Sequence, residues 1–273
     1  MSELFLPTLF IWGLIAGFLG GLLGVGGGMV FVLVIPEAAR RLGVQEVDLV
    51  SVTIANSLAC TFFTTFAAGV KKFACDNLIR KGVLSIGIFS TIVSLLVLHF
   101  VVNAGLMSKT FFDVFFIIIL LYLMLRIFFR IRKNKTAVEE TLLLKPNGVL
   151  LAGFFSGVVS ALSGLGGGIV IVPVLHAMLR FPIRIAQSIS FGVIAFSTFF
   201  SSIFNLLEHP VMEFESLHVG LILIPVIISI APISMVGSLL GSWVSGRMNS
   251  KWSAILLFAF LLFTLGRKII YMY

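Results

Sequence analysis

Residues 22–30 read LLGVGGGMV and residues 162–170 read LSGLGGGIV, so a glycine triplet occurs twice in nearly the same setting. The first triplet lies inside the apolar stretch 4–38 and the second inside the apolar stretch 148–179. Glycine disfavours a helix interior by about 1 kcal/mol relative to alanine, and it adopts positive φ angles without a steric penalty. Each triplet therefore predicts a break in a helix, at the same place in two long apolar segments.

The composition of the chain is that of a membrane protein. Of its 273 residues, 59% are hydrophobic and only 11% are charged, whereas a soluble domain carries about a quarter charged residues. Apolar runs of about twenty residues, enough to cross a bilayer core of roughly 30 Å, recur along the whole chain. A transmembrane barrel would show short alternating segments instead. The composition indicates an all-α polytopic membrane protein in contact with the lipid bilayer, which we expect in the cytoplasmic (inner) membrane.

We predict eight apolar segments, of which the first and fifth are longer than one crossing requires. Their bounds are about 4–38, 45–70, 82–102, 109–128, 148–179, 185–207, 217–245 and 252–272. The formal net charge is +8, and the basic residues gather in two polar stretches, 71–81 and 126–135. Basic residues of membrane proteins gather in cytoplasmic loops in this way. No basic domain is left over, so we predict no nucleic-acid partner.

The two glycine triplets belong to an internal repeat. With a shift of 140 residues, Gly24 pairs with Gly164 and the triplets coincide. A second match pairs AlaAsnSer at 55–57 with AlaGlnSer at 186–188. Internal repeats in membrane proteins are typical of transporters. We therefore divide the chain into a first transmembrane repeat of four segments at 1–129, a basic cytoplasmic linker at 130–147 and a second repeat of four segments at 148–273.

Charge counting predicts that the second repeat is inverted relative to the first. If every segment crosses the membrane and the loop 71–81 is cytoplasmic, twelve Lys and Arg residues lie inside and seven outside. If the first and fifth segments dip into the membrane and return, the split becomes fourteen to five. Because cytoplasmic loops carry the excess of Lys and Arg, we prefer the second arrangement. Each repeat then has one re-entrant hairpin and three crossings, and the odd number of crossings inverts the next repeat.

A hairpin that turns back inside the membrane explains why the triplets are there. After each break a half-helix begins, near Met29 and near Ile169. The first N–H groups of a helix have no partner within it, and the helix dipole adds partial positive charge at that end. Two inverted hairpins would point two such ends at one central position, which predicts an anion site made of backbone N–H groups. Other glycines fit close helix packing, namely Gly13, Gly17, Gly20, Gly21, Gly24, Gly153 and Gly157.

Polar side chains near the triplets are candidates for holding the anion. Asn56 lies near the middle of the second segment, and its amide can donate two hydrogen bonds to an oxyanion. Gln187 and Ser188 are the repeat partners of Asn56 and Ser57, although they lie near the cytoplasmic end of the sixth segment. Ser163 precedes the second triplet, where it could cap a half-helix or contact the ligand. The predicted substrate-binding set is Gly26, Gly27, Gly28, Met29, Thr53, Asn56, Ser57, Ser163, Gly166, Gly167, Gly168, Gln187 and Ser188.

These motifs carry a resemblance to a known family. A duplicated hydrophobic chain with GLLGVGGGMVFVLVIP and GLGGGIVIVPVL, each followed by a polar-Ser element, resembles the TauE/SafE sulfite exporter family, also called the toluenesulfonate uptake permease family. The resemblance covers nearly the whole chain. It implies a secondary transporter for a small anion such as sulfite, a sulfonate, sulfoacetate or thiosulfate. Members commonly carry Thr-Ser after the first glycine element, whereas this chain has Asn56-Ser57 and, in the second half, Gln187-Ser188.

Two other classes of function are kept as alternatives. An anion or small-solute channel is the stronger one, because two hairpins that meet at the midplane also describe channels. The weaker one is an intramembrane serine protease with Ser163 and the later His176, which a duplicated architecture disfavours. Cys60, Cys75 and the scattered histidines lack the spacing of metal ligands. We predict no cofactor, no metal and no enzymatic activity.

The sequence is less informative about coupling. No Asp or Glu lies in the middle of a segment, and the nearest carboxylate is Asp113 at the start of the fourth. Intramembrane carboxylates would suggest a proton relay. Uniport, proton symport through the substrate's own protonation and exchange therefore all stay open, as do the direction of transport and the oligomeric state.

Overall fold

The fold was analysed on a computed structural model of the chain. It describes residues 5–73, 77–103, 108, 110–115, 117–118, 121–122, 125, 146–175, 179, 181–212, 214, 216–247, 259, 262 and 266. Much of the predicted linker 130–147 and of the segments 109–128 and 252–272 lies outside these residues, as does His176. The elements are α1 (Phe5–Leu23), α2 (Gly28–Arg41), α3 (Leu49–Phe73), α4 (Asn77–Val97), a π-helix η1 (Leu98–Asn103), α6 (Pro146–Ser163), α7 (Gly168–Pro173), α8 (Ile183–Leu207), β1 (His218–Val219), β2 (Ile222–Leu223) and α9 (Ile224–Arg247).

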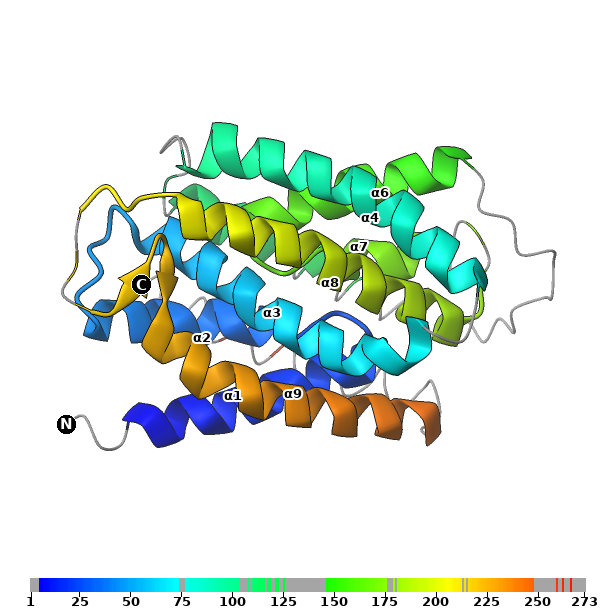
Figure 1. Cartoon of the computed structure of the whole chain (residues 1–273), viewed down its shortest axis with the longest axis horizontal. Coiled ribbons are helices and arrows are strands. Elements are labelled where there is room, and N and C mark those ends of the chain that lie inside the picture. Colours follow the sequence, from blue (N-terminus) through cyan, green and yellow to red (C-terminus); the bar gives the residue numbers. More distant parts are fainter. Residues whose placement is uncertain are drawn as a thin grey trace.

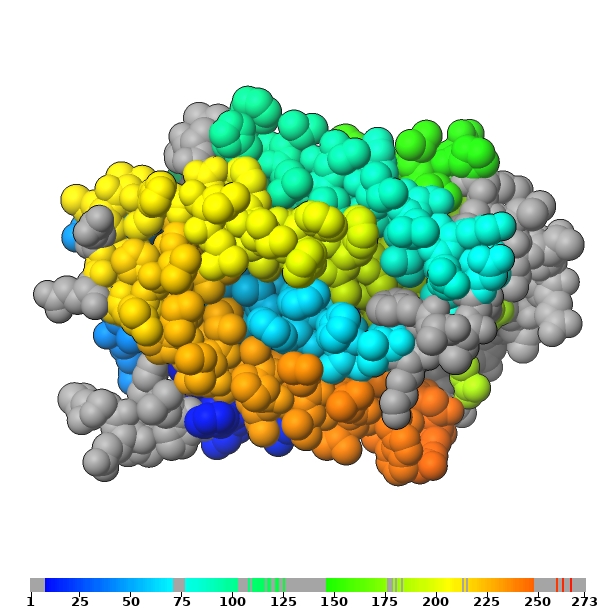
Figure 2. Space-filling view, in the orientation of Figure 1, coloured from blue at the N-terminus to red at the C-terminus, as the bar shows by residue number. Residues whose placement is uncertain are grey.

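The long helices form three layers, with α3 and α8 in the centre (Figure 1). Helices α1 and α9 pack together on one side of this central pair, and α4 and α6 pack together on the other. The short helices α2 and α7 pack against α3 and α8, respectively. Figure 2 shows α3, in light blue, running between α8 and α9 on the visible face.

The two glycine triplets break their helices as predicted. Helix α1 ends at Leu23 and α2 begins at Gly28, while α6 ends at Ser163 and α7 begins at Gly168. The half-helices therefore begin one residue before the predicted Met29 and Ile169. We call the connections 24–27 and 164–167 the first and second glycine turns.

Each pair of helices around a glycine turn folds back into a hairpin. At the open end of the first hairpin, the start of α1 and the end of α2 line one small cavity of about 100 Å³. In the second hairpin, a Cβ placed on Gly148 at the start of α6 would lie 2.6 Å from the side chain of Leu179, which follows α7. Figure 1 shows the first hairpin opening towards the end of the molecule where α1 starts, and the second towards the opposite end.

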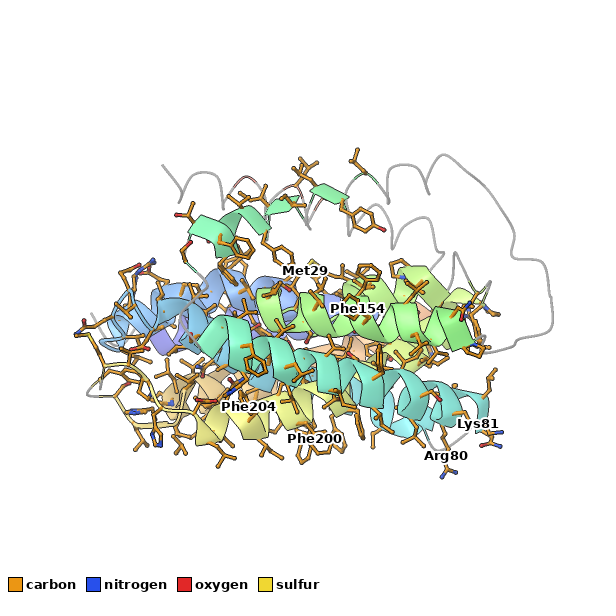
Figure 3. The ribbon with its side chains drawn as sticks, turned by 90° about the horizontal axis from the view of Figure 1, so that it is seen from above. Met29, Arg80, Lys81, Phe154, Phe200 and Phe204 are labelled. Carbon is orange, nitrogen blue, oxygen red and sulfur yellow. The ribbon has the colours of Figure 1, made fainter. Side chains whose placement is uncertain are left out.

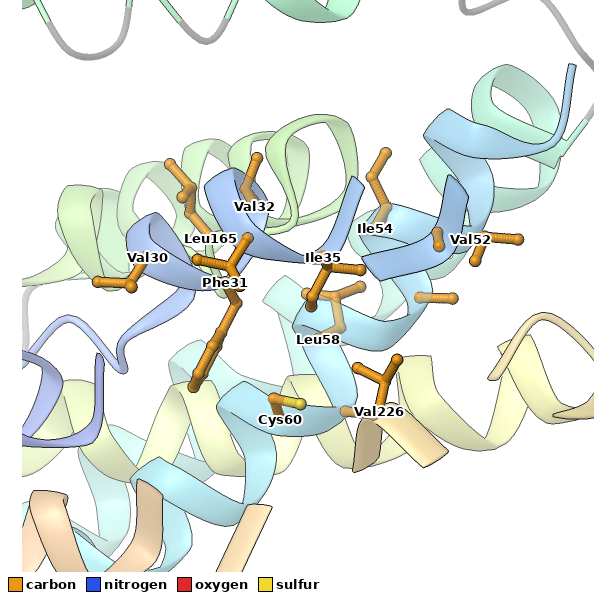
Figure 4. Close-up of a cluster of buried hydrophobic side chains, with 14 of the residues drawn as sticks. Val30, Phe31, Val32, Ile35, Val52, Ile54, Leu58, Cys60, Leu165 and Val226 are labelled. Atoms are coloured by element: carbon orange, nitrogen blue, oxygen red, sulfur yellow. The ribbon is translucent and has the colours of Figure 1, made fainter. Parts of the chain in front are cut away.

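Apolar side chains around α2 form the centre of the core. Phe31 and Ile35 of α2 are buried together with Leu58 of α3. Figure 4 shows Leu165 of the second glycine turn and Val226 of α9 beside the same cluster. The core thus joins elements from both halves of the chain around the first hairpin.

The outer surface of α4 is apolar, whereas its buried face combines small and polar residues with Ile79, Ile86 and Val93. Large apolar side chains recur at every fourth position and are 50–53% exposed: Leu84, Ile88, Ile92 and Leu96. The buried face carries Gly82, Gly87, Ser90 and Ser94. This is the reverse of a helix in water and suits lipid, where close packing needs small residues and the exterior can be apolar. Figure 3 shows Arg80 and Lys81 near the N-terminal end of α4.

Five of the described helices are long and apolar enough to cross a membrane. These are Leu49–Val70, Asn77–Val102, Pro146–Ser163, Arg184–Leu207 and Ile224–Arg247, with Thr8–Leu23 as a shorter apolar helix. Together with the apolar exterior, they show a multi-pass integral membrane protein, as the composition predicted.

Most of the remaining glycines pack helices closely together. A Cβ on Gly13 would lie 3.2 Å from the carbonyl oxygen of Ile230 in α9, and a Cβ on Gly153 would lie 3.2 Å from that of Ile86 in α4. Gly13 thus lets α1 approach the backbone of α9 as closely as Gly153 lets α6 approach the backbone of α4. Gly24, which was assigned to packing, is instead part of the first glycine turn, with a φ of 78°.

The predicted helix 217–245 begins later than expected. Residues 218–223 form a short antiparallel β-hairpin, in which Val219 pairs with Ile222, and α9 starts only at Ile224. The tip of the hairpin covers the end of α8, since the Leu221 N–H donates to the carbonyl of Asn205 at 3.0 Å. The apolar pattern missed this because strands of two residues are too short to show alternation.

Candidate functional site

The two glycine turns have nearly the same backbone conformation. The φ angles are 78°, 88° and 76° at Gly24, Gly26 and Gly27, and 69°, 76° and 75° at Gly164, Gly166 and Gly167. Residues with a Cβ rarely adopt these angles, because the left-handed region costs them about 1–2 kcal/mol. Glycine is therefore required at these positions by backbone geometry as well as by packing.

The two turns touch each other at the centre of the molecule. A Cβ on Gly28 would lie 2.8 Å from the Cα of Leu165, and a Cβ on Gly168 would lie 3.0 Å from the Cα of Val25. Met29, beside this contact, lies near the middle of the long axis (Figure 3). The structure thus brings together Gly26, Gly27, Gly28, Met29, Gly166, Gly167 and Gly168 of the predicted set.

Backbone donors at the start of both short helices are left without partners. In α2 the first N–H to be paired is that of Val30, which donates to the carbonyl of Gly27 at 3.0 Å, and in α7 it is that of Val170, which donates to the carbonyl of Gly167 at 3.0 Å. Within the described residues, the N–H groups of Gly28 and Met29 have no hydrogen-bond acceptor. Helix α2 has 14 residues and α7 only six, so most of the helix-dipole contribution comes from α2.

Hydroxyls from the two central helices bind the turns. Ser57 of α3 donates to the carbonyl of Gly164 at 2.8 Å, and Ser190 of α8 donates to the carbonyl of Gly24 at 2.8 Å. Ser57 was predicted as an anion contact, but its hydroxyl proton is used by the Gly164 carbonyl, and Ser190 was not among the predicted residues.

The contacts of the structure match Ser57 with Ser190, two residues after the predicted partner Ser188. Ser188, the predicted partner of Ser57, donates within α8 to the carbonyl of Arg184 at 2.8 Å. Gln187 lies outside the contact between the turns and donates to the carbonyl of Leu22 at 3.4 Å. The counterpart of Ser57 by contact is Ser190, so the similarity of AlaAsnSer and AlaGlnSer misled the alignment.

Asn56 is fully buried, and its amide is occupied by backbone groups. Its Nδ2 donates to the carbonyls of Val52 and Leu221, at 2.8 and 2.9 Å, and its Oδ1 accepts from the Leu223 N–H at 2.8 Å. The amide therefore ties α3 to the β-hairpin before α9. Both N–H donors that the sequence assigned to an anion are already used.

Two of the buried hydroxyls on α3 have no partner. Thr53, a predicted site residue, and Thr61 are 1% and 0% exposed, and neither hydroxyl makes a hydrogen bond. A buried polar group without a partner costs about 1–3 kcal/mol. Together with Ser57 and Thr65 they recur at every fourth position along one face of α3. That spacing was visible in the sequence and would have pointed to Thr61.

Ser163 is engaged in local hydrogen bonds. Its hydroxyl donates to the carbonyl of Val159, and it accepts from the Leu165 N–H at 3.3 Å. It thus stabilises the turn after α6, and the half-helix α7 has no side-chain cap. Its protease partner His176 lies outside the described residues.

Charged groups gather at the end of the molecule where the first hairpin opens. The carboxylate of Asp48 is 3% exposed and accepts from the N–H groups of Val211 and Met212, both at 2.9 Å. Arg40 pairs with Glu46 at 2.7 Å, and this hydrogen bond raises the pKa of the guanidinium above its ordinary value. Among the described residues, no cluster of His, Cys, Asp or Glu could hold a metal ion.

Comparison with known proteins identifies the class to which this chain belongs. Residues 9–269 match the family described as sulfite exporter TauE/SafE. The chain belongs to this family of membrane transporters, which agrees with the resemblance found in its glycine motifs.

Individual relatives are named only as probable transporters. A probable membrane transporter protein of Methanocaldococcus jannaschii is 30% identical over 260 residues, which cover 93% of this chain and 91% of the relative. A probable membrane transporter protein of Haemophilus influenzae is 26% identical over 249 residues, covering 89% and 90% of the two chains. The probable membrane transporter protein YunE of Bacillus subtilis is 25% identical over 279 residues, covering 96% of each. No solved structure is significantly similar.

Proposed function

We propose that this protein is a secondary transporter that moves a small anion across the cytoplasmic membrane. The substrate class is a sulfur oxyanion or organosulfonate, such as sulfite, a sulfonate, sulfoacetate or thiosulfate, as membership of the family suggests. The observation that carries the proposal is the pair of unpaired N–H groups at Gly28 and Met29, at the central contact between the glycine turns. Such a helix N-terminus binds anions through its N–H groups and its dipole.

We further propose that the two halves are inverted repeats with re-entrant hairpins. The hairpins open at opposite ends of the molecule, as Figure 1 shows. Equivalent residues of the two halves make matching contacts: Gly28 corresponds to Gly168, and Ser57 corresponds to Ser190. Broken backbone at membrane depth is tolerated where it is buried in protein, and both turns are buried.

In this arrangement the glycine turns serve as both gate and binding site. The turns touch each other in the structure, so an anion reaches the N–H groups of α2 only when the hairpins separate. Movement of one repeat against the other would open the site to each side in turn, which is the general mode of inverted-repeat transporters.

Anion binding and flux by the purified protein test this function. The melting temperature is measured with sulfite, thiosulfate, sulfoacetate, taurine, isethionate, lactate and chloride, because a ligand of the folded state raises it by mass action. Uptake into proteoliposomes is then measured with the anion that binds, with and without a pH gradient, to detect proton coupling. Counterflow of labelled anion supports a transporter, whereas flux without counterflow supports a channel. Absence of both binding and flux would reject the anion transporter.

A further inference from the structure

Thr61 of α3 lies against both glycine turns at once. Its Cγ2 atom is 2.9 Å from the position that a Cβ would take on Gly26 and 2.8 Å from that on Gly166. The side chain is completely buried. Thr61 is therefore at the contact between the two hairpins, where the proposed function places the anion.

The hydroxyl of Thr61 differs from its neighbours in having no partner. Thr64 and Thr65 donate to the carbonyls four residues earlier, both at 2.7 Å, and Thr198 of α8 does so at 2.6 Å. Thr61 Oγ1 makes no such bond, although the carbonyl of Ser57 lies one turn before it. Buried hydroxyls are nearly always paired, so an unpaired one at the contact between the two glycine turns needs an explanation. A polar group of a bound substrate would supply the missing partner.

Opposite Thr61, the second half of the chain contributes an isoleucine. Ile194 of α8 contacts the same two turns, with its Cγ2 atom 3.5 Å from a Cβ on Gly26 and 2.8 Å from one on Gly166. Thr61 and Ile194 are thus equivalent in position but not in chemistry. The site would be polar on the side of α3 and apolar on the side of α8.

We propose that Thr61 is the side-chain donor that binds the anion and that Ile194 forms the apolar wall facing it. The proposal rests on the transport function given above. The hydroxyl and the N–H groups of Gly28 and Met29 would hold the oxygen atoms of the anion, and Ile194 would contact its organic part. The site would therefore orient a small anion that has one charged end and one apolar end, and would favour it over a purely inorganic oxyanion.

Binding of ethanesulfonate and sulfite to single variants tests this assignment. We expect Thr61→Val to weaken ethanesulfonate binding about tenfold, as removal of one hydrogen bond to a charged group does. Because the hydroxyl is unpaired in the free protein, the same change should leave the melting temperature without ligand unchanged or raise it. Thr61→Ser should retain binding. Thr91→Val is the matched control, since the Thr91 hydroxyl is paired within α4, at 2.8 Å from the Gly87 carbonyl.

The outcomes separate this assignment from the transport function. If the wild-type protein binds and Thr61→Val binds equally well, Thr61 is not a ligand but the transporter stands. If the wild-type protein neither binds nor transports any anion, both proposals are rejected. Ile194→Thr should shift the preference towards sulfite, and an unchanged ratio of the two affinities would reject the apolar wall. If Thr61→Val does not fold, Thr61→Ala provides the same comparison.

Discussion

Ser57 and Ser190 each donate a hydrogen bond to the glycine turn of the other half of the chain. Ser57 binds the carbonyl of Gly164 and Ser190 binds the carbonyl of Gly24, both at 2.8 Å. Each central helix thus holds the hairpin that belongs to the opposite half. These two hydrogen bonds hold both hairpins to the central helices, and any separation of the turns has to break them.

Removing either serine hydroxyl should loosen the central contact. Ser57→Ala and Ser190→Ala each leave a buried glycine carbonyl without its donor, so we expect each to lower the free energy of unfolding by about 1–2 kcal/mol. The thermal midpoint in detergent measures this. Ser202→Ala is the control, because Ser202 donates only to the carbonyl of Thr198 in its own helix. Equal thermal midpoints for all three variants would contradict a structural role of these two hydrogen bonds.

A side chain on the central glycine of either triplet should abolish transport while the protein still inserts into the membrane. Gly27→Val and Gly167→Val force a branched residue into a positive φ angle, and their Cβ atoms would lie 2.7 Å from the carbonyl oxygen of Ala16 and 2.6 Å from that of Ser156. Gly43→Val has the same φ problem, at 85°, but meets nothing within 4 Å. We therefore expect it to transport. Normal uptake by the two turn variants would reject the half-helix site.

Asn56 should matter for stability, whereas Thr53 should not. Asn56→Ala leaves the carbonyl of Leu221 and the N–H of Leu223 unpaired in a buried place, which we expect to cost about 2–4 kcal/mol. Thr53→Val, one turn earlier on the same helix, removes a hydroxyl that has no partner. Its thermal midpoint should match the wild type. If Asn56→Ala keeps the wild-type midpoint but loses anion binding, the amide contacts substrate after all.

Labelling of single cysteines from each side of the membrane should reveal the re-entrant hairpins. Asn147 near the start of α6 and Pro182 just before α8 are exposed, so cysteines at both positions should react from the cytoplasm, as one at Lys81 should. Cysteines at Val47 and Val211, which are 65% and 75% exposed, should react from outside. If every segment crossed the membrane, Pro182 and Val211 would each react from the opposite side.

The glycine breaks were predictable because they depend on local backbone chemistry. A triplet inside an apolar segment leaves few alternatives to a helix that stops and restarts, and α2 and α7 begin within one residue of the expected places. The sheet at 218–223 was not predictable, because its strands of two residues are too short to show alternation. The β-hairpin partners of Asn56 and the bonds from Ser57 and Ser190 to the glycine turns were not predictable either. They join residues more than a hundred positions apart, which leave no pattern within a segment.

The sequence by itself determined that this chain is a polytopic membrane protein of a transporter family, since hydropathy, glycine motifs and charge are properties of local segments. Only the tertiary structure decided which polar groups remain free. Asn56 and Thr61 are both polar residues of the same helix. The amide of Asn56 is occupied by the backbone of the β-hairpin, whereas the hydroxyl of Thr61 is unpaired and its methyl group packs against both turns. Hydrogen-bond satisfaction is a property of the folded neighbourhood, and residue type alone does not reveal it.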